Sequence, residues 1–378
     1  MVRILIVGAS IGSLAAATRL RRLMPQADII LVNRASTFVH RRHVPHILSG
    51  MHSLGSATID LGQYCEKHNI RFHLGTVSKI DSGERALSIG EQRLAYDALL
   101  VDLPSEPSSA SEPGVHDILP LAGEASAHAL RTHLLSELQH AARTSLGAHR
   151  TTVIVGAGHR GIEAAGEIHS LQARAAAHEL VFPQELSILL LHANGDEREH
   201  IPKSAHARIM KALGKRGISS AKPTHVKYEP GRVTVDGHLT ESGSIVWTAG
   251  ERGNHLLIHS GIAVDQDGFA LVDHALRTSN ERIFALGHSI VTIGNEAVPR
   301  ARRAADLVEE GRLAAYNMAA TVLGTRLHTL PTVGKAPRVV TIGTSAFGWF
   351  GPFSFHHTIP YTLHKNAETR AFEKLHEA

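Results

Sequence analysis

The sequence has a single cysteine, Cys65, in 378 residues. One cysteine excludes an intramolecular disulfide and any redox centre built from two thiols. It also excludes iron–sulfur clusters and structural zinc sites that need four cysteine ligands. Any redox chemistry carried out by this chain would therefore depend on a bound cofactor and not on a pair of cysteines.

Long apolar runs and strongly basic blocks are absent as well. No apolar stretch approaches the roughly 18 residues of a membrane-spanning helix, and the N-terminal sequence, Met1 to Gly8, lacks the layout of a signal peptide. Lys and Arg number 39 against 35 for Asp and Glu, without a run of five basic residues, so a nucleic-acid partner is not expected. We expect a cytoplasmic protein, with peripheral membrane contact left open.

Hydrophobic residues make up 43% and charged residues 20% of the chain, ordinary values for a globular protein. At roughly 100–200 residues per domain, the length suggests two or three domains. Two segments, which begin at Ile4 and Val153, repeat one pattern of apolar strand, glycine-rich turn, alanine-rich helix and second apolar strand. Short apolar strands between helices indicate buried parallel strands, and hence an α/β fold with two nucleotide-binding domains.

The second glycine turn, Gly156 to Gly161, follows the pattern of dinucleotide-binding sites. Gly156 permits a tight turn after the strand, Gly158 lets the backbone approach a pyrophosphate, and Gly161 allows close helix–strand packing. The next strand ends at His192 instead of the acid that binds a ribose hydroxyl, which is compatible with a 2′-phosphate or with an exposed histidine. The turn predicts nucleotide binding, and a turn retained only for packing is the alternative.

The first glycine turn, Gly8 to Ser13, keeps only part of this pattern. Ser10 and Ser13 stand where the second and third glycines belong, and both add volume close to the phosphate position. Asn33 replaces the acid at the end of the next strand, and its amide can bond a ribose hydroxyl without charge assistance. Dinucleotide binding and its loss are both compatible with this turn.

Further segments complete the pattern of a known family. They are Ile245 to Gly250 (IVWTAG), Ile283 to His288 (IFALGH), Pro299 to Asn317 and Leu363 to Lys365. Together with the second glycine turn, they resemble the two-dinucleotide-domain flavoprotein oxidoreductases, the pyridine nucleotide–disulfide reductase superfamily. Within it, the chain is most similar to the cysteine-free quinone reductases, which include type II NADH dehydrogenases and apoptosis-inducing-factor-like ferroptosis suppressors.

The resemblance implies two Rossmann-like three-layer (ββα-type) dinucleotide-binding domains, one inserted in the other, plus a short C-terminal α+β segment. The FAD-type domain would comprise residues 1–118 and 256–325, the NAD(P)H-binding domain residues 119–255, and the C-terminal segment residues 326–378. In such proteins, hydride passes from NADH or NADPH to FAD, and the electrons then reach a quinone-like acceptor. The sequence leaves open the choice between NADH and NADPH, and between a monomer and a homodimer.

The resemblance also assigns roles to individual residues. Glu163 and Lys365 are the candidate catalytic residues, with a helix-dipole contact as the simpler interpretation of Glu163 and a surface lysine as that of Lys365. The residues that would contact the cofactors are Gly8, Ser10, Ile11, Gly12, Ser13, Asn33, Arg34, Arg42, Val77, Gly156, Gly158, His159, Arg160, Gly161, His192, Gly250, Gly287 and His288.

The basic segment His40 to His43 stands where the disulfide reductases of this family carry a redox cysteine, with Arg42 near that cysteine's position. It predicts a cluster that binds an anion through charge-assisted hydrogen bonds, and a solvated loop is the alternative. A metal site at His40 and His43 is not expected, because no carboxylate lies near them in the sequence.

Several departures from the family pattern leave a second function open. Asp102 lies where the family has a small turn, and His288 lies where it has an aspartate near the flavin ribityl chain. With Ser10, Ser13 and Asn33, these residues are compatible with a degenerate flavin site. The chain would then be a non-redox or repurposed biosynthetic protein that binds another ligand. A flavoprotein that acts on a small molecule instead of a quinone is a third alternative.

Aromatic residues make up only 4% of the chain, yet Phe347, Trp349, Phe350 and Phe353 lie close together. With the neighbouring glycines and Pro352, this segment is expected to form an apolar loop. Contact with a membrane surface and packing onto the core are the two interpretations of the loop.

Overall fold

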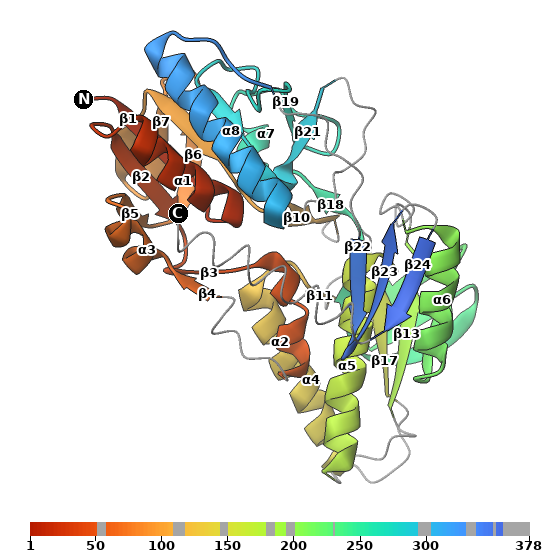
Figure 1. The fold of residues 1–378 in the computed structure, drawn as a ribbon. Helices are drawn as coiled ribbons and strands as arrows, with labels where there is room; N and C mark the ends of the chain where they lie inside the picture. Colours follow the sequence, from red (N-terminus) through yellow and green to blue (C-terminus); the bar gives the residue numbers. More distant parts are fainter. Residues whose placement is uncertain are drawn as a thin grey trace.

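The computed structural model describes residues 1–50, 58–108, 118–143, 150–178, 186–193, 201–229, 231–293, 304–329, 338–350 and 353–357. The chain forms two α/β lobes (Figure 1). Most N-terminal elements, coloured red and orange, make up one lobe together with α8 (Ala304–Leu323), whereas α2 (His46–Ser49) packs against the other lobe. The middle of the chain, coloured yellow and green, makes up the other.

The first lobe is built on a five-stranded parallel sheet in the order β20-β9-β1-β2-β5. Its strands are β1 (Arg3–Val7), β2 (Asp28–Asn33), β5 (Arg71–Leu74), β9 (Ala98–Val101) and β20 (Ile283–Ala285). The central strands are apolar and buried, as parallel strands between helices must be. Because these strands run parallel, the residues that follow β1, β9 and β20 meet at one edge of the sheet.

Helices and a second sheet cover the two faces of this sheet. Helix α1 (Ile11–Leu23) lies beside α8 (Figure 1), and the two helices approach so closely that a β-carbon at Gly311 would overlap the carbonyl oxygen of Gly12. The other elements of this lobe are β3 (Thr37–Val39), β4 (Thr58–Asp60), α3 (Leu61–Lys67) and the antiparallel strands β6 (Val77–Asp81), β7 (Ala86–Ile89) and β8 (Gln92–Ala95).

The second lobe contains a seven-stranded sheet in the order β14-β13-β12-β17-β16-β15, with β11 paired to β17. Its strands are β11 (Ile118–Pro120), β12 (Arg150–Val155), β13 (Leu186–Leu191), β14 (Ile218–Ala221), β15 (Val226–Glu229), β16 (Arg232–Val235) and β17 (His238–Trp247). Its helices are α4 (Glu124–Arg143), α5 (His159–Ala177) and α6 (Lys203–Gly214). The predicted α/β class is therefore confirmed, while the predicted domain boundaries stay predictions.

A three-stranded antiparallel sheet from the C-terminal part packs on the second lobe. It consists of β22 (Arg338–Ile342), β23 (Ser345–Phe350) and β24 (Phe353–His357). A β-carbon at Gly166 of α5 would lie 2.8 Å from the Cα atom of Ile342, so strand and helix touch through their backbones. The expected loop from Phe347 is wrong for residues 347–350, which are a strand. Phe347 and Trp349 are 4% and 3% exposed in the core, as the packing interpretation required.

Short elements connect the two lobes and complete the first. They are η1 (Arg41–His43), α2 (His46–Ser49), β10 (Glu106–Pro107), β18 (Glu251–Arg252), α7 (His255–Ile258), β19 (Ala270–Val272), η6 (Gly287–Ser289) and β21 (Ile290–Thr292). Strand β10 pairs antiparallel with β18, which joins segments from before and after the second sheet. Among the described residues, no helix has the length and apolarity needed to cross a membrane.

Candidate functional site

The second glycine turn lies at the carboxyl end of β12, where α5 begins. Gly156 has a φ of +111°, and a β-carbon there would lie 2.7 Å from the amide nitrogen of Ala249. A β-carbon at Gly161 would overlap the carbonyl oxygen of Gly156. Both positions therefore require glycine, for backbone conformation at the first and for space at the second.

Gly158 is the N-cap of α5, with φ −76° and ψ −173°, and no side chain of its own caps the helix. The amides at the start of an α-helix carry partial positive charge, which makes this end of α5 suited to an anion such as a pyrophosphate. The turn thus combines a tight chain reversal with the start of a helix, while its role in nucleotide binding stays a prediction.

Thr248 supports the turn from the neighbouring strand. Its hydroxyl oxygen lies 2.9 Å from the carbonyl oxygen of Val155 and 3.0 Å from that of Gly156, so it donates to the backbone just before α5. The parallel pairing of β12 with β17 brings this residue to the turn, with Val155 opposite Trp247. The sequence motif IVWTAG was recognised, but the role of the threonine within it became visible only in the structure.

Arg160 takes part in a network between the lobes. Its guanidinium and that of Arg41 both form ion pairs with Glu251 on β18. Arg41 Nη1 also donates to Ser105 Oγ at 3.1 Å, and Arg160 Nη1 donates to the carbonyl oxygen of Leu121 at 3.4 Å. Sequence reasoning missed Glu251, because Arg41 and Glu251 are 210 positions apart and no local pattern connects them.

His192 follows β13 at the same edge of the second sheet. Its amide donates to the carbonyl oxygen of Ala221 at 2.9 Å, and its ring centroid lies 5.2 Å from that of His206 on α6. Burial and the neighbouring His192 lower the pKa of His206 below its usual value, which favours a neutral ring at pH 7.

The candidate catalytic Glu163 is buried, 9% exposed, in the first turn and a half of α5. Its Oε1 accepts hydrogen bonds from the amide and the hydroxyl of Thr341 on β22, each at 3.3 Å. One turn later, Glu167 lies 2.7 Å from Nδ1 of His46 on α2. Both acids therefore connect α5 to neighbouring elements. Lys365 and the side chain of Arg42 lie outside the described residues.

The first glycine turn holds an unexpected internal contact. The hydroxyl of Ser10 donates to Oδ2 of Asp102, and the amide of Ser13 donates to the same oxygen at 3.2 Å. Ser10 and Ser13 also bond to each other, because the amide of Ser10 donates to Ser13 Oγ at 2.7 Å. The amide of Gly12 donates to Ser10 Oγ at 2.9 Å. The start of α1 is thus capped and occupied by groups of the chain itself.

Asp102 is 6% exposed, and a second buried acid lies nearby. Burial, with a smaller effect from the charge of Glu310, raises the pKa of Asp102 to about 6, against the lowering effect of hydrogen bonds from Ser10 and Ser13. Glu310 on α8 is 2% exposed and accepts a hydrogen bond from the amide of Gly287 at 3.3 Å. Two buried acids therefore stand at the edge of the first sheet.

The other predicted cofactor residues of the first lobe are spread around this edge. Asn33 uses its side-chain amide locally, donating to the carbonyl oxygen of Ala35 at 2.9 Å. Arg34 is exposed, Val77 lies in the hydrophobic core, and His288 is half-buried in η6. A β-carbon at Gly287 would overlap Oδ1 of Asp102, so η6 lies directly against that carboxyl group.

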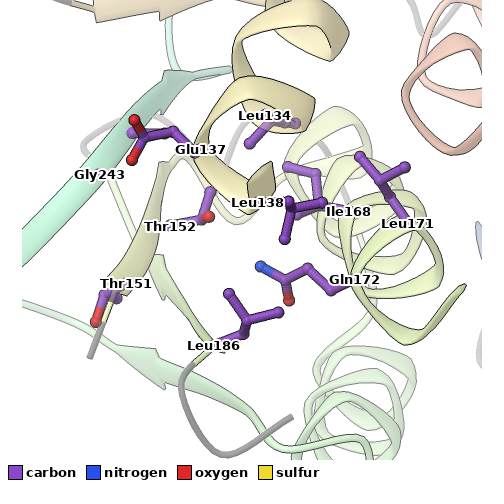
Figure 2. Close-up of a pocket in the computed structure, with 11 residues that line it drawn as sticks. Leu134, Glu137, Leu138, Thr151, Thr152, Ile168, Leu171, Gln172, Leu186 and Gly243 are labelled. Atoms are coloured by element: carbon purple, nitrogen blue, oxygen red, sulfur yellow. The ribbon is translucent and has the colours of Figure 1, made fainter. Parts of the chain in front are cut away.

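Figure 2 shows a pocket in the second lobe, and no residue of either glycine turn lines it. Its lining residues are Leu134, Glu137, Leu138, Thr151, Thr152, Ile168, Leu171, Gln172, Leu186, Gly243 and Ser244. Thr151 and Thr152 come from the amino end of β12, whereas the glycine turn follows its carboxyl end. Ligands of open α/β sheets bind at the carboxyl ends of strands, so this pocket is a gap in the packing between α4, α5 and the sheet. Within the described parts of the chain, no group of three or more His, Cys, Asp or Glu residues could hold a metal.

Residues 2–306 match the family model described as pyridine nucleotide-disulphide oxidoreductase. The chain is 25% identical over 299 residues to the probable ferredoxin reductase CtmF of Castellaniella defragrans, a match that covers 75% of this chain and 67% of CtmF. It is 26% identical over 317 residues to the type II NADH:quinone oxidoreductase NdhA of Mycobacterium tuberculosis, covering 75% of this chain and 65% of NdhA. The matches thus span about two thirds of the length of these relatives.

The fold agrees with this family match. The sulfide:quinone oxidoreductase from Aquifex aeolicus superposes with a TM-score of 0.80 over 99% of this chain and 91% of that structure, at 16% sequence identity. Proteins of this family are NAD(P)H-dependent flavin oxidoreductases that typically bind FAD and NAD(P)H. With a family match that covers most of its length and two α/β lobes in place, this chain belongs to the pyridine nucleotide-disulphide oxidoreductase family.

Proposed function

We propose that this chain binds a nicotinamide dinucleotide, NADH or NADPH, at the second glycine turn. The supporting observation is the start of α5, where glycine is required at Gly156 and Gly161 and the N-cap Gly158 contributes no side-chain bond. This leaves the positive end of the helix dipole facing the place that a pyrophosphate would take. His192 at the end of β13 brings no negative charge, so a 2′-phosphate is not repelled there and both coenzymes remain candidates.

The first candidate activity is an FAD-dependent NAD(P)H oxidoreductase that passes hydride through the flavin to a quinone-like acceptor. It is supported by membership of the family and by the similarity to proteins named as quinone oxidoreductases. Glu163 and Lys365 are its proposed catalytic residues. A cytoplasmic location and a homodimer also belong to this proposal.

A second candidate is favoured by the first glycine turn, whose residues do not fit the pyrophosphate of FAD. The donors at the start of α1 are bonded to Asp102 and to the serines, and the buried carboxyl group stands where negative charge would arrive. The chain would then bind NAD(P)H without holding FAD as its family does, and would be a non-redox protein or one repurposed for another ligand. Binding of NAD(P)H is common to both candidates, so it is the function we propose first.

Titration of the purified protein with NADH and NADPH tests this proposal, with Gly158→Leu as the key variant. The backbone at Gly158 has φ −76° and ψ −173°, which leucine adopts without strain, so the variant should fold. Its side chain would fill the approach of the pyrophosphate, and we expect the affinity to fall by at least about 100-fold, or about 2.7 kcal/mol.

Gly214→Leu is the matched control, because Gly214 belongs to the same lobe and a β-carbon there would meet open space. Its affinity for NADH and NADPH should equal that of the wild type. Equal affinity in the Gly158→Leu variant, or no binding of either coenzyme by the wild type, would contradict the proposed function. The coenzyme that binds with the higher affinity, NADH or NADPH, is the expected physiological donor.

A further inference from the structure

We propose that Asp102 is an internal ligand of α1, occupying the position that the FAD pyrophosphate would take and thereby keeping FAD out of the first lobe. The site at α1 is separate from the turn at α5, so the two proposals can fail independently. The inference explains why a chain of this family combines an intact second turn with an altered first one.

The sheet delivers Asp102 to the start of α1. Strands β1 and β9 are adjacent and parallel, with Val7 opposite Val101. The residues that follow them, Gly8 and Asp102, therefore leave the sheet side by side. The amide of Asp102 donates to the carbonyl oxygen of Val7 at 2.8 Å, which continues the strand pairing. The backbone of Asp102 is thus held in place by the sheet, and its side chain reaches α1 without a loop rearrangement.

Three donors at the start of α1 are already used. An anion at a helix start binds the first amides and any nearby hydroxyl. Here the amide of Ser13 and the hydroxyl of Ser10 donate to Asp102, while the amide of Gly12 donates to Ser10. The carboxylate also gains the favourable interaction with the helix dipole that a phosphate would gain.

Charge adds a second obstacle. Asp102 and Glu310 are both buried, and Glu310 is the titratable group on α8 whose charge acts on Asp102. Glu310 also accepts a hydrogen bond from the amide of Gly287 at 3.3 Å. Gly287 belongs to η6, which lies directly against Asp102. A pyrophosphate brought to this place would meet negative charge in a poorly solvated environment, where repulsion is stronger than in water.

The departures from the family pattern form one network. A serine at position 10 introduces a hydroxyl that needs an acceptor, and Asp102 supplies it. A serine at position 13 supplies an amide to Asp102 and a hydroxyl to the amide of Ser10. Because each of the three residues satisfies another, the altered turn is a complete hydrogen-bonded structure and not a partly lost binding site.

Equilibrium dialysis against FAD at pH 8, followed by visible flavin absorption, tests the inference. The wild type should come through gel filtration colourless. Asp102→Ala, which removes the carboxyl group and opens its space, should bind FAD at least about 100-fold more tightly than the wild type. Asp102→Asn, which keeps the shape and removes the charge, should show a smaller increase. Glu167→Gln, at a buried acid on α5, is the matched control and should match the wild type.

Two results would overturn the inference. One is a wild type that carries tightly bound FAD after purification. The other is an Asp102→Ala variant that is folded by circular dichroism and binds FAD no better than the wild type. If Asp102→Ala does not fold, the isosteric Asp102→Asn decides the comparison by the same criterion. NADH titration of the same proteins separates the two proposals. If the wild type does not bind NADH, only the function proposed for the turn at α5 is contradicted.

Discussion

Replacing Gly161 by valine is expected to abolish NAD(P)H binding and to lower the free energy of unfolding by about 3 kcal/mol. Any β-carbon at this position would overlap the carbonyl oxygen of Gly156 and lie 2.9 Å from Oγ1 of Thr248. Neither neighbour can move easily. The amide of Gly156 is bonded to the carbonyl oxygen of Leu191 at 2.8 Å, and the hydroxyl of Thr248 is bonded to the carbonyl oxygen of Val155 at 2.9 Å.

Denaturant unfolding followed by circular dichroism measures this loss, and coenzyme titration measures the binding. Gly214→Val is the control, since a β-carbon there meets nothing within contact distance. Valine has a higher helix propensity than glycine, so this variant should be at least as stable as the wild type. The Gly158→Leu variant should lose binding while keeping its stability. If Gly161→Val unfolds at the same denaturant concentration as the wild type, the close contact described for this turn is wrong.

The stability of the first lobe is expected to increase as the pH falls through about 6 towards 4, owing to Asp102. Its pKa in the folded chain is raised to about 6 from an ordinary value of 3.8, so the folded state binds its proton more tightly than the unfolded state. The favourable contribution is therefore complete below about pH 4 and is lost as the pH rises through 6. The difference between the two pKa values corresponds to about 3 kcal/mol.

Other acids titrate in the same range, so the informative quantity is the difference in unfolding free energy between the wild type and Asp102→Asn. The amide is neutral at every pH, and the variant should be more stable than the wild type by up to about 3 kcal/mol at pH 8. The difference should shrink to a small value at pH 4, where Asp102 is protonated in the folded state and about half protonated in the unfolded state. If the difference in unfolding free energy does not change with pH, the pKa of Asp102 is not raised in the folded state.

The second glycine turn could be predicted residue by residue. Its three glycines lie within six positions of one another, and the strand before them and the helix after them are visible in the local pattern of apolar residues. Local geometry alone demands glycine at Gly156 and Gly161.

The state of the first turn could not be predicted. Ser10 and Asp102 are separated by 92 positions, and their contact depends on β1 and β9 being neighbours in the sheet. The same holds for Glu310 and Gly287, and for the ion pairs of Glu251 with Arg41 and Arg160. The sequence showed that Asp102 departs from the family pattern, but it did not show which groups would donate hydrogen bonds to its carboxyl group.

The secondary structure of the aromatic segment near the C-terminus could not be predicted either. Its glycines and Pro352 suggested a loop, yet residues 347–350 belong to β23 and pair with strands on both sides. Phe347 and Trp349 lie on one face of this strand, two residues apart, and that face is buried against the second lobe. Composition could not distinguish a loop from the central strand of a small sheet, because the difference depends on what packs against the segment.

Local pattern was therefore sufficient for the α/β class, the two nucleotide-type lobes and the glycine geometry of the second turn. These depend on backbone sterics and on the burial of short apolar strands, which act within a few residues. The closure of the first turn by Asp102 and the burial of Glu163 against Thr341 depend on strand order and on the docking of the C-terminal sheet. Contacts of this kind join residues about a hundred positions apart or more, and they exist only once the sheet has been assembled.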